Sequence, residues 1–134
     1  MSHLATRNTL LTYAQTLLGE IPIAYENYDF DPSGLNEYVA FYYMPATSES
    51  TGKTAKSSDD ERGFIQLSVF INADAPTYDN RQLEIIDIIK QGFYNTLNID
   101  GVIIEEVQAN QGAKSDSWFK RDLTINFSTF FKRV

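Results

Sequence analysis

The stretch RGFIQLSVFI, from Arg62 to Ile71, alternates between two sets of side chains and therefore predicts a β-strand. One set is wholly aliphatic and would share one face of the strand: Ile65, Leu67, Val69 and Ile71. The other set mixes polar and aromatic side chains: Phe64, Gln66, Ser68 and Phe70. Because successive side chains of a strand point to opposite faces, the aliphatic face is predicted to lie against a hydrophobic core.

Two other segments have the pattern of strands that would pair with this one. The segment Glu37–Met44 is apolar or aromatic on both faces, which is typical of a strand covered on two sides by its own fold or by a neighbouring subunit. The segment from Ser117 to Phe131 alternates between apolar and polar residues. Its core side is predicted to carry Phe119, Leu123, Ile125 and Phe127.

Two segments have helical periodicity instead. Near the N-terminus, apolar residues form one stripe, and Gly19 fits the position just after a helix end: Leu10, Leu11, Ala14, Leu17 and Leu18. The second helix is predicted to begin near Asp79, which with Gln82 three residues later resembles a capping box. Its main stripe consists of Ile86, Ile89, Phe93 and Leu97.

These elements predict an α+β fold for the whole chain. Short strands at Ile21–Asn27 and Val102–Gln108 would join the three strands above, so the sheet is mainly antiparallel, with about four to five strands. Both helices are expected on one face of the sheet. The length of 134 residues suits one domain over residues 1–134.

Residues 45–62 interrupt the strand pattern with a long polar stretch. From Thr47 to Glu61 only Ala55 is hydrophobic. Long connections without apolar residues are usually functional or disordered. We therefore predict that this stretch is the polar loop at the tip of a long hairpin, flexible over about 45–62.

The composition excludes several classes of function. The chain has no cysteine and one histidine, so disulfides, thiolate metal sites and serine–histidine catalysis within one chain are excluded. The formal net charge of −7 makes specific nucleic-acid binding and docking on anionic lipid unfavourable. No stretch approaches the roughly 20 apolar residues of a membrane span, and no secretory signal is expected.

Carboxylate clusters give weak hints of metal or acid–base chemistry. Asp29, Asp31 and Ser33 imitate half of a calcium loop, but the position of the bidentate carboxylate is Ala40, so a plain turn is the better interpretation. The run 59–61 is more typical of a solvated loop than of a metal site. Glu105 and Glu106 are neighbours on a predicted strand, which would place them on opposite faces.

The best candidates for a functional surface are aromatic and basic residues. Tyr38 and Tyr42 fit a core position and an interface position equally well, whereas Phe41 and Phe127 fit the core better. The candidate residues for an oligomer or partner interface are Tyr38, Tyr42, Met44, Lys53, Lys56 and Trp118. No catalytic, metal or cofactor-binding residue is predicted.

Several segments together resemble a known family. The opening MSHLATRNTLLTYAQTL is followed by IAYENYDFDPSG, by the strands EYVAFYYMPA and RGFIQLSVFI, and by the closing WFKRDLTINFSTFF. This order is similar to that of the tail terminator-like proteins of long-tailed bacteriophages, related in role to minor tail protein U. None of the matching segments encodes catalytic chemistry.

The resemblance implies a structural virion protein at the head-proximal end of the tail, made in the host cytoplasm. Such proteins form a ring, usually of six copies, which ends tube polymerisation and offers a surface for joining the head. The implied partners are further copies of the chain, the tail tube protein and a head–tail connector protein, with DNA passing through the ring. A head–tail connector or neck adaptor is the alternative role, and a small carboxylate or metal-dependent enzyme is a weaker one.

Overall fold

A computed structural model describes residues 3–25, 30–32, 34–50, 58–72, 78–110, 112–115 and 118–132. Two helices and seven strands follow one another in these residues. They are α1 (His3–Leu18), β1 (Ile23–Tyr25), β2 (Glu37–Ser50), β3 (Ser58–Asn72), α2 (Tyr78–Gly92), β4 (Asn98–Ile99), β5 (Val102–Ala109), β6 (Ala113–Ser115) and β7 (Trp118–Lys132).

The strands form one mostly antiparallel sheet, and the α+β prediction is confirmed. The strand order is β1-β2-β3-β7-β5-β4, with β6 paired to β7, and only β1 runs parallel to its neighbour. The short strand expected at Ile21–Asn27 is present as β1, and the strand count exceeds the prediction because two further short strands, β4 and β6, add to the sheet. These two strands have two and three residues, which is too short for an alternating pattern to reveal.

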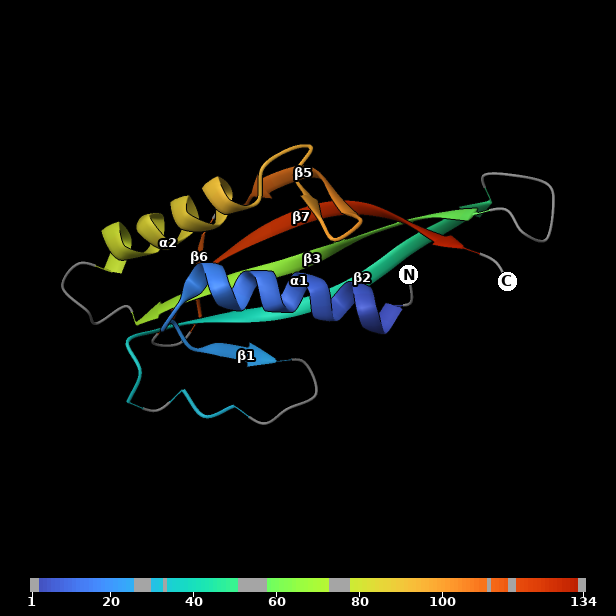
Figure 1. The fold of residues 1–134 in the computed structure, drawn as a ribbon. Helices are drawn as coiled ribbons and strands as arrows, with labels where there is room; N and C mark the ends of the chain where they lie inside the picture. Colours follow the sequence, from blue (N-terminus) through green and yellow to red (C-terminus); the bar gives the residue numbers. More distant parts are fainter. Residues whose placement is uncertain are drawn as a thin grey trace.

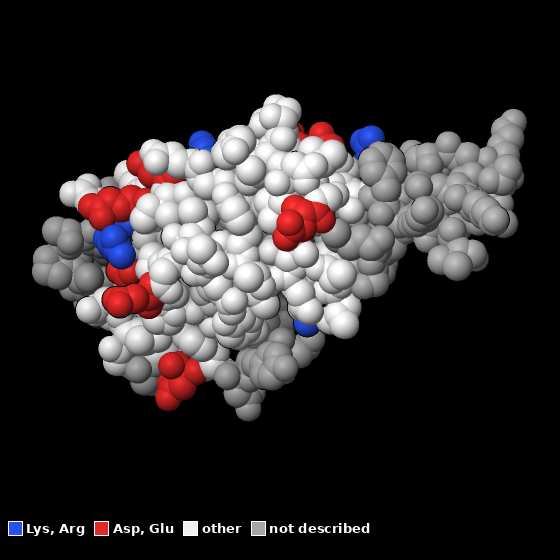
Figure 2. Space-filling model, in the orientation of Figure 1, with Lys and Arg blue, Asp and Glu red and all other residues white. Residues whose placement is uncertain are grey.

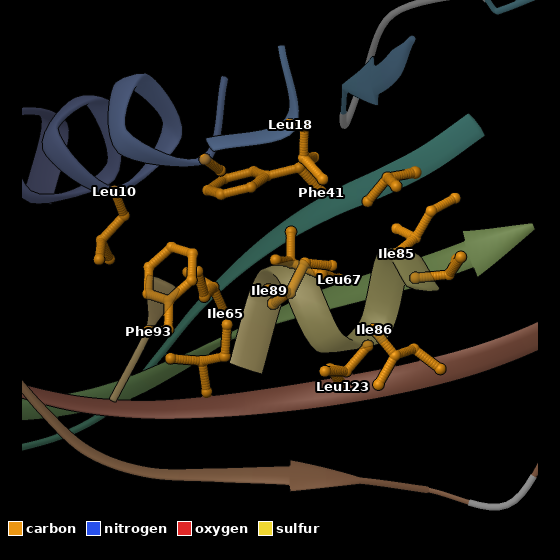
Figure 3. Close-up of a cluster of buried hydrophobic side chains, with 14 of the residues drawn as sticks. Leu10, Leu18, Phe41, Ile65, Leu67, Ile85, Ile86, Ile89, Phe93 and Leu123 are labelled. Atoms are coloured by element: carbon orange, nitrogen blue, oxygen red, sulfur yellow. The ribbon is translucent and has the colours of Figure 1, made fainter. Parts of the chain in front are cut away.

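Strand β3 is central because it has a partner along both edges. Its register places Leu67 between Phe41 of β2 and Leu123 of β7. All three side chains are at most 2% exposed. Both helices cover this face of the sheet (Figure 1), and their apolar stripes close the core (Figure 3). The predicted core positions Phe41 and Phe127 are confirmed as buried.

Helix α1 ends as the sequence predicts. Gly19 has a φ of 64° and donates its backbone N–H to the carbonyl of Gln15 at 3.0 Å. The positive φ favours glycine, which is why the helix can stop there at little cost. Further along, the Tyr13 hydroxyl donates to the Gly92 carbonyl at 2.6 Å and joins α1 to the end of α2.

Gln82 does not cap α2, and this part of the sequence prediction is wrong. The helix begins at Tyr78, and the Gln82 side chain is completely buried between helix and sheet. Its Nε2 donates to the carbonyls of Val69 at 3.2 Å and Phe119 at 3.1 Å. The spacing of Asp79 and Gln82 is typical of a capping box. In the fold, however, the Gln82 side chain is buried, and its amide bonds to two carbonyls of the sheet instead of to the start of the helix.

A second polar link holds the start of α2 to β2. Arg81 donates Nε to Glu37 Oε1 and Nη2 to Glu37 Oε2, both at 2.8 Å, and it also reaches Glu84 at 3.1 Å. The hydrogen bonds to Glu37 raise the pKa of Arg81 above its ordinary value. This two-pronged geometry fixes the side chains more tightly than a single contact between charges would.

The predicted polar loop is largely paired strand, which corrects its boundaries. Strand β2 continues to Ser50 and β3 starts at Ser58, so only residues 51–57 of the predicted loop lie outside the described residues. The strands persist without an apolar pattern because β7 supplies a third strand: Asp59 of β3 is opposite both Ser50 and Phe131. We call the ribbon formed by 46–50, 58–62 and 128–132 the arm.

We expect Gln82→Leu to lower the free energy of unfolding by about 1–3 kcal/mol, because two buried carbonyls lose their amide donor. The same substitution at exposed Gln91 of α2 is the matched control and should change stability by less than about 0.5 kcal/mol. Urea unfolding of the two variants makes the comparison. Equal stability of both variants would show that the Gln82 hydrogen bonds contribute nothing.

Candidate functional site

The face of the sheet that turns away from the helices is called the outer face here. It carries the even-numbered side chains of β2 as far as Met44, of β3 from Arg62 and of β7 as far as Ser128, since the odd-numbered positions of these stretches supply the core. No described helix covers it, because α1 and α2 both lie on the other side (Figure 1). Four of the predicted interface residues lie on this face: Tyr38, Tyr42, Met44 and Trp118.

An aromatic cluster occupies one end of the outer face. Tyr38 stacks on Phe70 with ring centroids 4.6 Å apart, and Trp118 meets Tyr38 edge-on at 5.0 Å. Phe30, from the segment that follows β1, packs on Tyr38 at 4.8 Å. Burial in this cluster, with a smaller contribution from Tyr42, raises the pKa of Tyr38. The structure thus brings Tyr38 and Trp118 together, and it gives Tyr38 aromatic neighbours within its own chain.

A row of polar side chains lies next to the aromatic cluster. Gln66 donates to Ser68 at 3.2 Å, and Ser68 donates to Asp122 at 2.6 Å. Lys120 lies 3.7 Å from Asp122 and also stands over the Phe70 ring at 5.9 Å. Opposite charges therefore offset one another within this row.

Two cross-strand rows between this polar row and the arm form what we call the outer sheet patch. In one row Tyr42, Gln66 and Thr124 are direct neighbours, and in the next Met44, Phe64 and Asn126 are direct neighbours. Met44 is 39% exposed. Tyr42 and Met44 were predicted as interface residues, whereas Phe64 was seen only as the second face of a strand. The sequence signal that could have identified all six side chains is the alternation of each strand, because every second residue of a strand shares one face.

A β-bulge places two carboxylates beside the outer sheet patch and corrects the prediction for them. The register between β5 and β7 shifts between Ile104 and Glu106. Glu105 accepts a hydrogen bond from Ser128 at 2.5 Å, while Glu106 is opposite Asn126 and accepts one from Gln108 at 2.8 Å. The extra residue turns both glutamates to the outer face, where strict alternation would separate them.

These two glutamates line an open hollow of about 490 Å³ next to the patch. Its other lining residues come from β3 and β7: Arg62, Gly63, Phe64, Asn126 and Phe127. Both carboxylates are exposed. The hollow therefore gives this end of the outer face a charged rim, in which the two glutamates outnumber Arg62.

The other residues that the sequence analysis named contribute little to a described site. Lys53, Lys56 and Asp29 lie outside the described residues, and Asp31 is exposed. Among the side chains that the structure describes, no three histidine, cysteine, aspartate or glutamate residues gather as metal ligands. Neither described helix is long and apolar enough to cross a membrane.

The comparison with protein-family models identifies one family. The family model described as "Phage tail terminator protein" matches residues 3–127. No curated protein matches the chain. A solved structure with 19% sequence identity covers 98% of this chain and 94% of its own, with a TM-score of 0.64, which shows a shared fold. The family match extends over nearly every described element, and the chain belongs to the phage tail terminator family, whose members are structural components of the virion tail.

Proposed function

We propose that copies of this chain close into a ring of six on the head-proximal end of the tail tube. The ring ends polymerisation of the tube and presents a surface to which the head joins. The chain acts by binding alone and performs no reaction. Its partners are other copies, the tail tube protein and a head–tail connector protein.

The uncovered outer sheet patch is the observation that supports this proposal most directly. Its side chains are apolar or uncharged, and Met44 stays well exposed although Tyr42 and Phe64 lie beside it. Surfaces that combine aromatic and methionine side chains with few charges are typical of interface centres. A protein that works by capping needs such a surface, whereas a catalyst would need converging reactive groups.

The acidic balance suits a ring through which DNA passes. With a formal net charge of −7 for each copy, the assembly repels phosphate over a distance of about 10 Å at moderate salt. This repulsion would keep the DNA from adhering to the ring during passage. Specific nucleic-acid binding and membrane binding play no part in the proposed role.

The arm supplies a second contact in this proposal. Its strands project beyond the helix-covered part of the sheet (Figure 1), and its connection contains Lys53 and Lys56. Two lysines without an intervening acid would favour an acidic surface on a neighbouring copy or on the tube. The arm would therefore reach outward while the sheet patch makes the closer contact.

The first test is whether rings form, and whether the outer sheet patch is needed for them. Electron micrographs of the purified protein at high concentration should show closed rings, and loss of the gene should give tails of uncontrolled length. The double variant Tyr42→Ser/Met44→Ser should weaken association by about tenfold or more, because it removes apolar contact area. The variant should stay folded, since Met44 is exposed and Tyr42 is half-buried, and its unfolding midpoint checks this.

The control is Leu83→Ser, which removes another exposed apolar side chain, 42% exposed, from α2. This variant should assemble normally. Monomers at every concentration, combined with tails of normal length without the gene, would disprove the proposal. Co-purification with the connector protein alone, and never with tube protein, would assign the neck adaptor role instead.

A second test concerns the arm. Replacing residues 51–58 by Asn-Gly joins Ser50 to Asp59, which are directly opposite each other, through a two-residue hairpin turn. The monomer should keep its unfolding midpoint, because the core is untouched, while assembly should be impaired. The variant Lys53→Ser/Lys56→Ser keeps the length of this segment and removes only its two charges, so it shows whether assembly needs the charges or the length. A large drop in the midpoint of the shortened chain would show that this segment stabilises the fold instead.

A further inference from the structure

The outward surface of α1 is unusual for so acidic a chain. From Met1 to Gly19 there is no aspartate or glutamate, and Arg7 is the only lysine or arginine. The exposed side chains of α1 are mainly uncharged, including Asn8, Thr12 and Gln15, and Leu4 is 62% exposed. Figure 2 shows this face, where the area over α1 is largely free of charge and most acidic groups lie around it. We call this surface the α1 surface.

The α1 surface and the outer sheet patch lie on opposite sides of the molecule. Helix α1 lies against one face of the sheet, and the patch is on the other (Figure 1). A closed ring is built from two different surfaces of each subunit, one meeting the previous copy and one meeting the next. Two charge-poor surfaces on opposite sides of a thin slab satisfy this geometric requirement.

The charges of the two surfaces are complementary. Arg7 is exposed on α1, and Glu105 and Glu106 are exposed beside the outer sheet patch. Two copies that each carry −7 repel one another in most orientations. Contact between α1, which has no acids, and a rim where two glutamates outnumber Arg62 lessens that repulsion and pairs Arg7 with the glutamates.

Pairing between sheet edges is a poorer way to join the copies. In the described chain β1 pairs with β2 only as far as Phe41, so the rest of β2 is an edge. Pro45 on that edge has no N–H to donate, and the register shifts between Pro45 and Thr47. The edge of β5 has its own bulge and two glutamates. Prolines, bulges and charges are the features that block edge pairing in natural sheets.

We propose that the α1 surface of one copy docks on the outer sheet patch of the next copy, with Arg7 opposite Glu105 and Glu106. The proposal rests on the proposed ring and names the two surfaces that build it. The uncharged side chains of α1 cover Tyr42, Met44 and Phe64. The charge pair lies at the rim, where it sets orientation and speeds association.

A charge-exchange experiment tests this arrangement. Arg7→Glu alone puts like charges at every interface. Glu106→Lys alone places a lysine opposite Arg7 and leaves Glu105 as the one remaining acid there. Each variant should lower the fraction of protein in rings by about tenfold or more at low salt.

In an equimolar mixture, copies of the two variants can alternate around the ring. The introduced glutamate of one variant then meets the introduced lysine of the other, and the unchanged Arg7 and Glu106 meet at the following interface. The mixture should therefore recover rings, and it can do so only when the subunit number is even.

The controls use exposed charges of α2 outside both surfaces. Lys90→Glu matches the charge change of Arg7→Glu, and Asp87→Lys matches that of Glu106→Lys. Both control variants should form rings as the unchanged chain does. Unfolding midpoints measured for all four variants identify any loss that comes from misfolding.

Cross-linking gives a readout that does not depend on charge. Because the chain has no cysteine, Thr12→Cys/Thr124→Cys introduces the only two thiols, one on each surface. A short bismaleimide should join copies into a ladder that ends at the ring. The variant Thr12→Cys/Asp87→Cys, with both thiols on the helix side, should give no such ladder.

The outcomes separate this inference from the proposed function. Rings of the unchanged chain that persist in Arg7→Glu and in Glu106→Lys, with no cross-linked ladder, would overturn the docking mode and leave the capping role standing. Failure of the unchanged chain to form rings at any concentration would overturn the proposed function itself.

Discussion

The structure depends on one constraint: a single sheet has two faces, and the helices among the described residues cover only one of them. The aliphatic side of β3 is buried beneath α1 and α2, with Leu67 between Phe41 and Leu123. Gln82 reinforces this arrangement by donating to carbonyls of β3 and β7 from the helix side. Burial of apolar area on this side provides most of the stability. The other side of the sheet is then left to solvent or to another molecule.

The two ends of the outer face differ in how well their side chains are covered by neighbouring side chains. At one end four aromatic side chains shield one another, and the neighbouring polar row neutralises its own charges through Lys120 and Asp122. Toward the arm, Tyr42, Met44 and Phe64 have no comparable cover among the described residues. Tyr38 and Tyr42, which are indistinguishable in sequence, thus have different environments. The difference arises from three rings that contact Tyr38: Phe30, Phe70 and Trp118. Phe70 and Trp118 come from strands that are distant from Tyr38 in sequence.

Alternation and helical periodicity predicted the core of this fold because those patterns express burial directly. The aliphatic positions from Ile65 to Ile71 are buried as expected, and so are Ile86, Ile89 and Phe93. The predicted helix extends too far, because α2 ends at Gly92 and Leu97, which follows it, is only partly buried. Features that depend on pairing rather than burial were not predictable in this way. The strands continue into the polar stretch because β7 completes the ladder, and the glutamates share a face because of a bulge. The sequence does contain a trace of that bulge, since two adjacent glutamates interrupt the alternation of β5.

A protein that ends the growth of a polymer must associate without itself continuing to polymerise. Open sheet edges would allow unlimited addition of strands, but here Pro45 and the register shifts of β2 and β5 interrupt the edges. In the proposed ring, association is thereby directed to the two faces of the molecule, which carry unlike surfaces. When the rotation between neighbours closes, such head-to-tail contact is exhausted after a fixed number of copies. In the proposed ring, blunted edges and one-sided helix cover would therefore act together, because both direct association to the faces of the sheet.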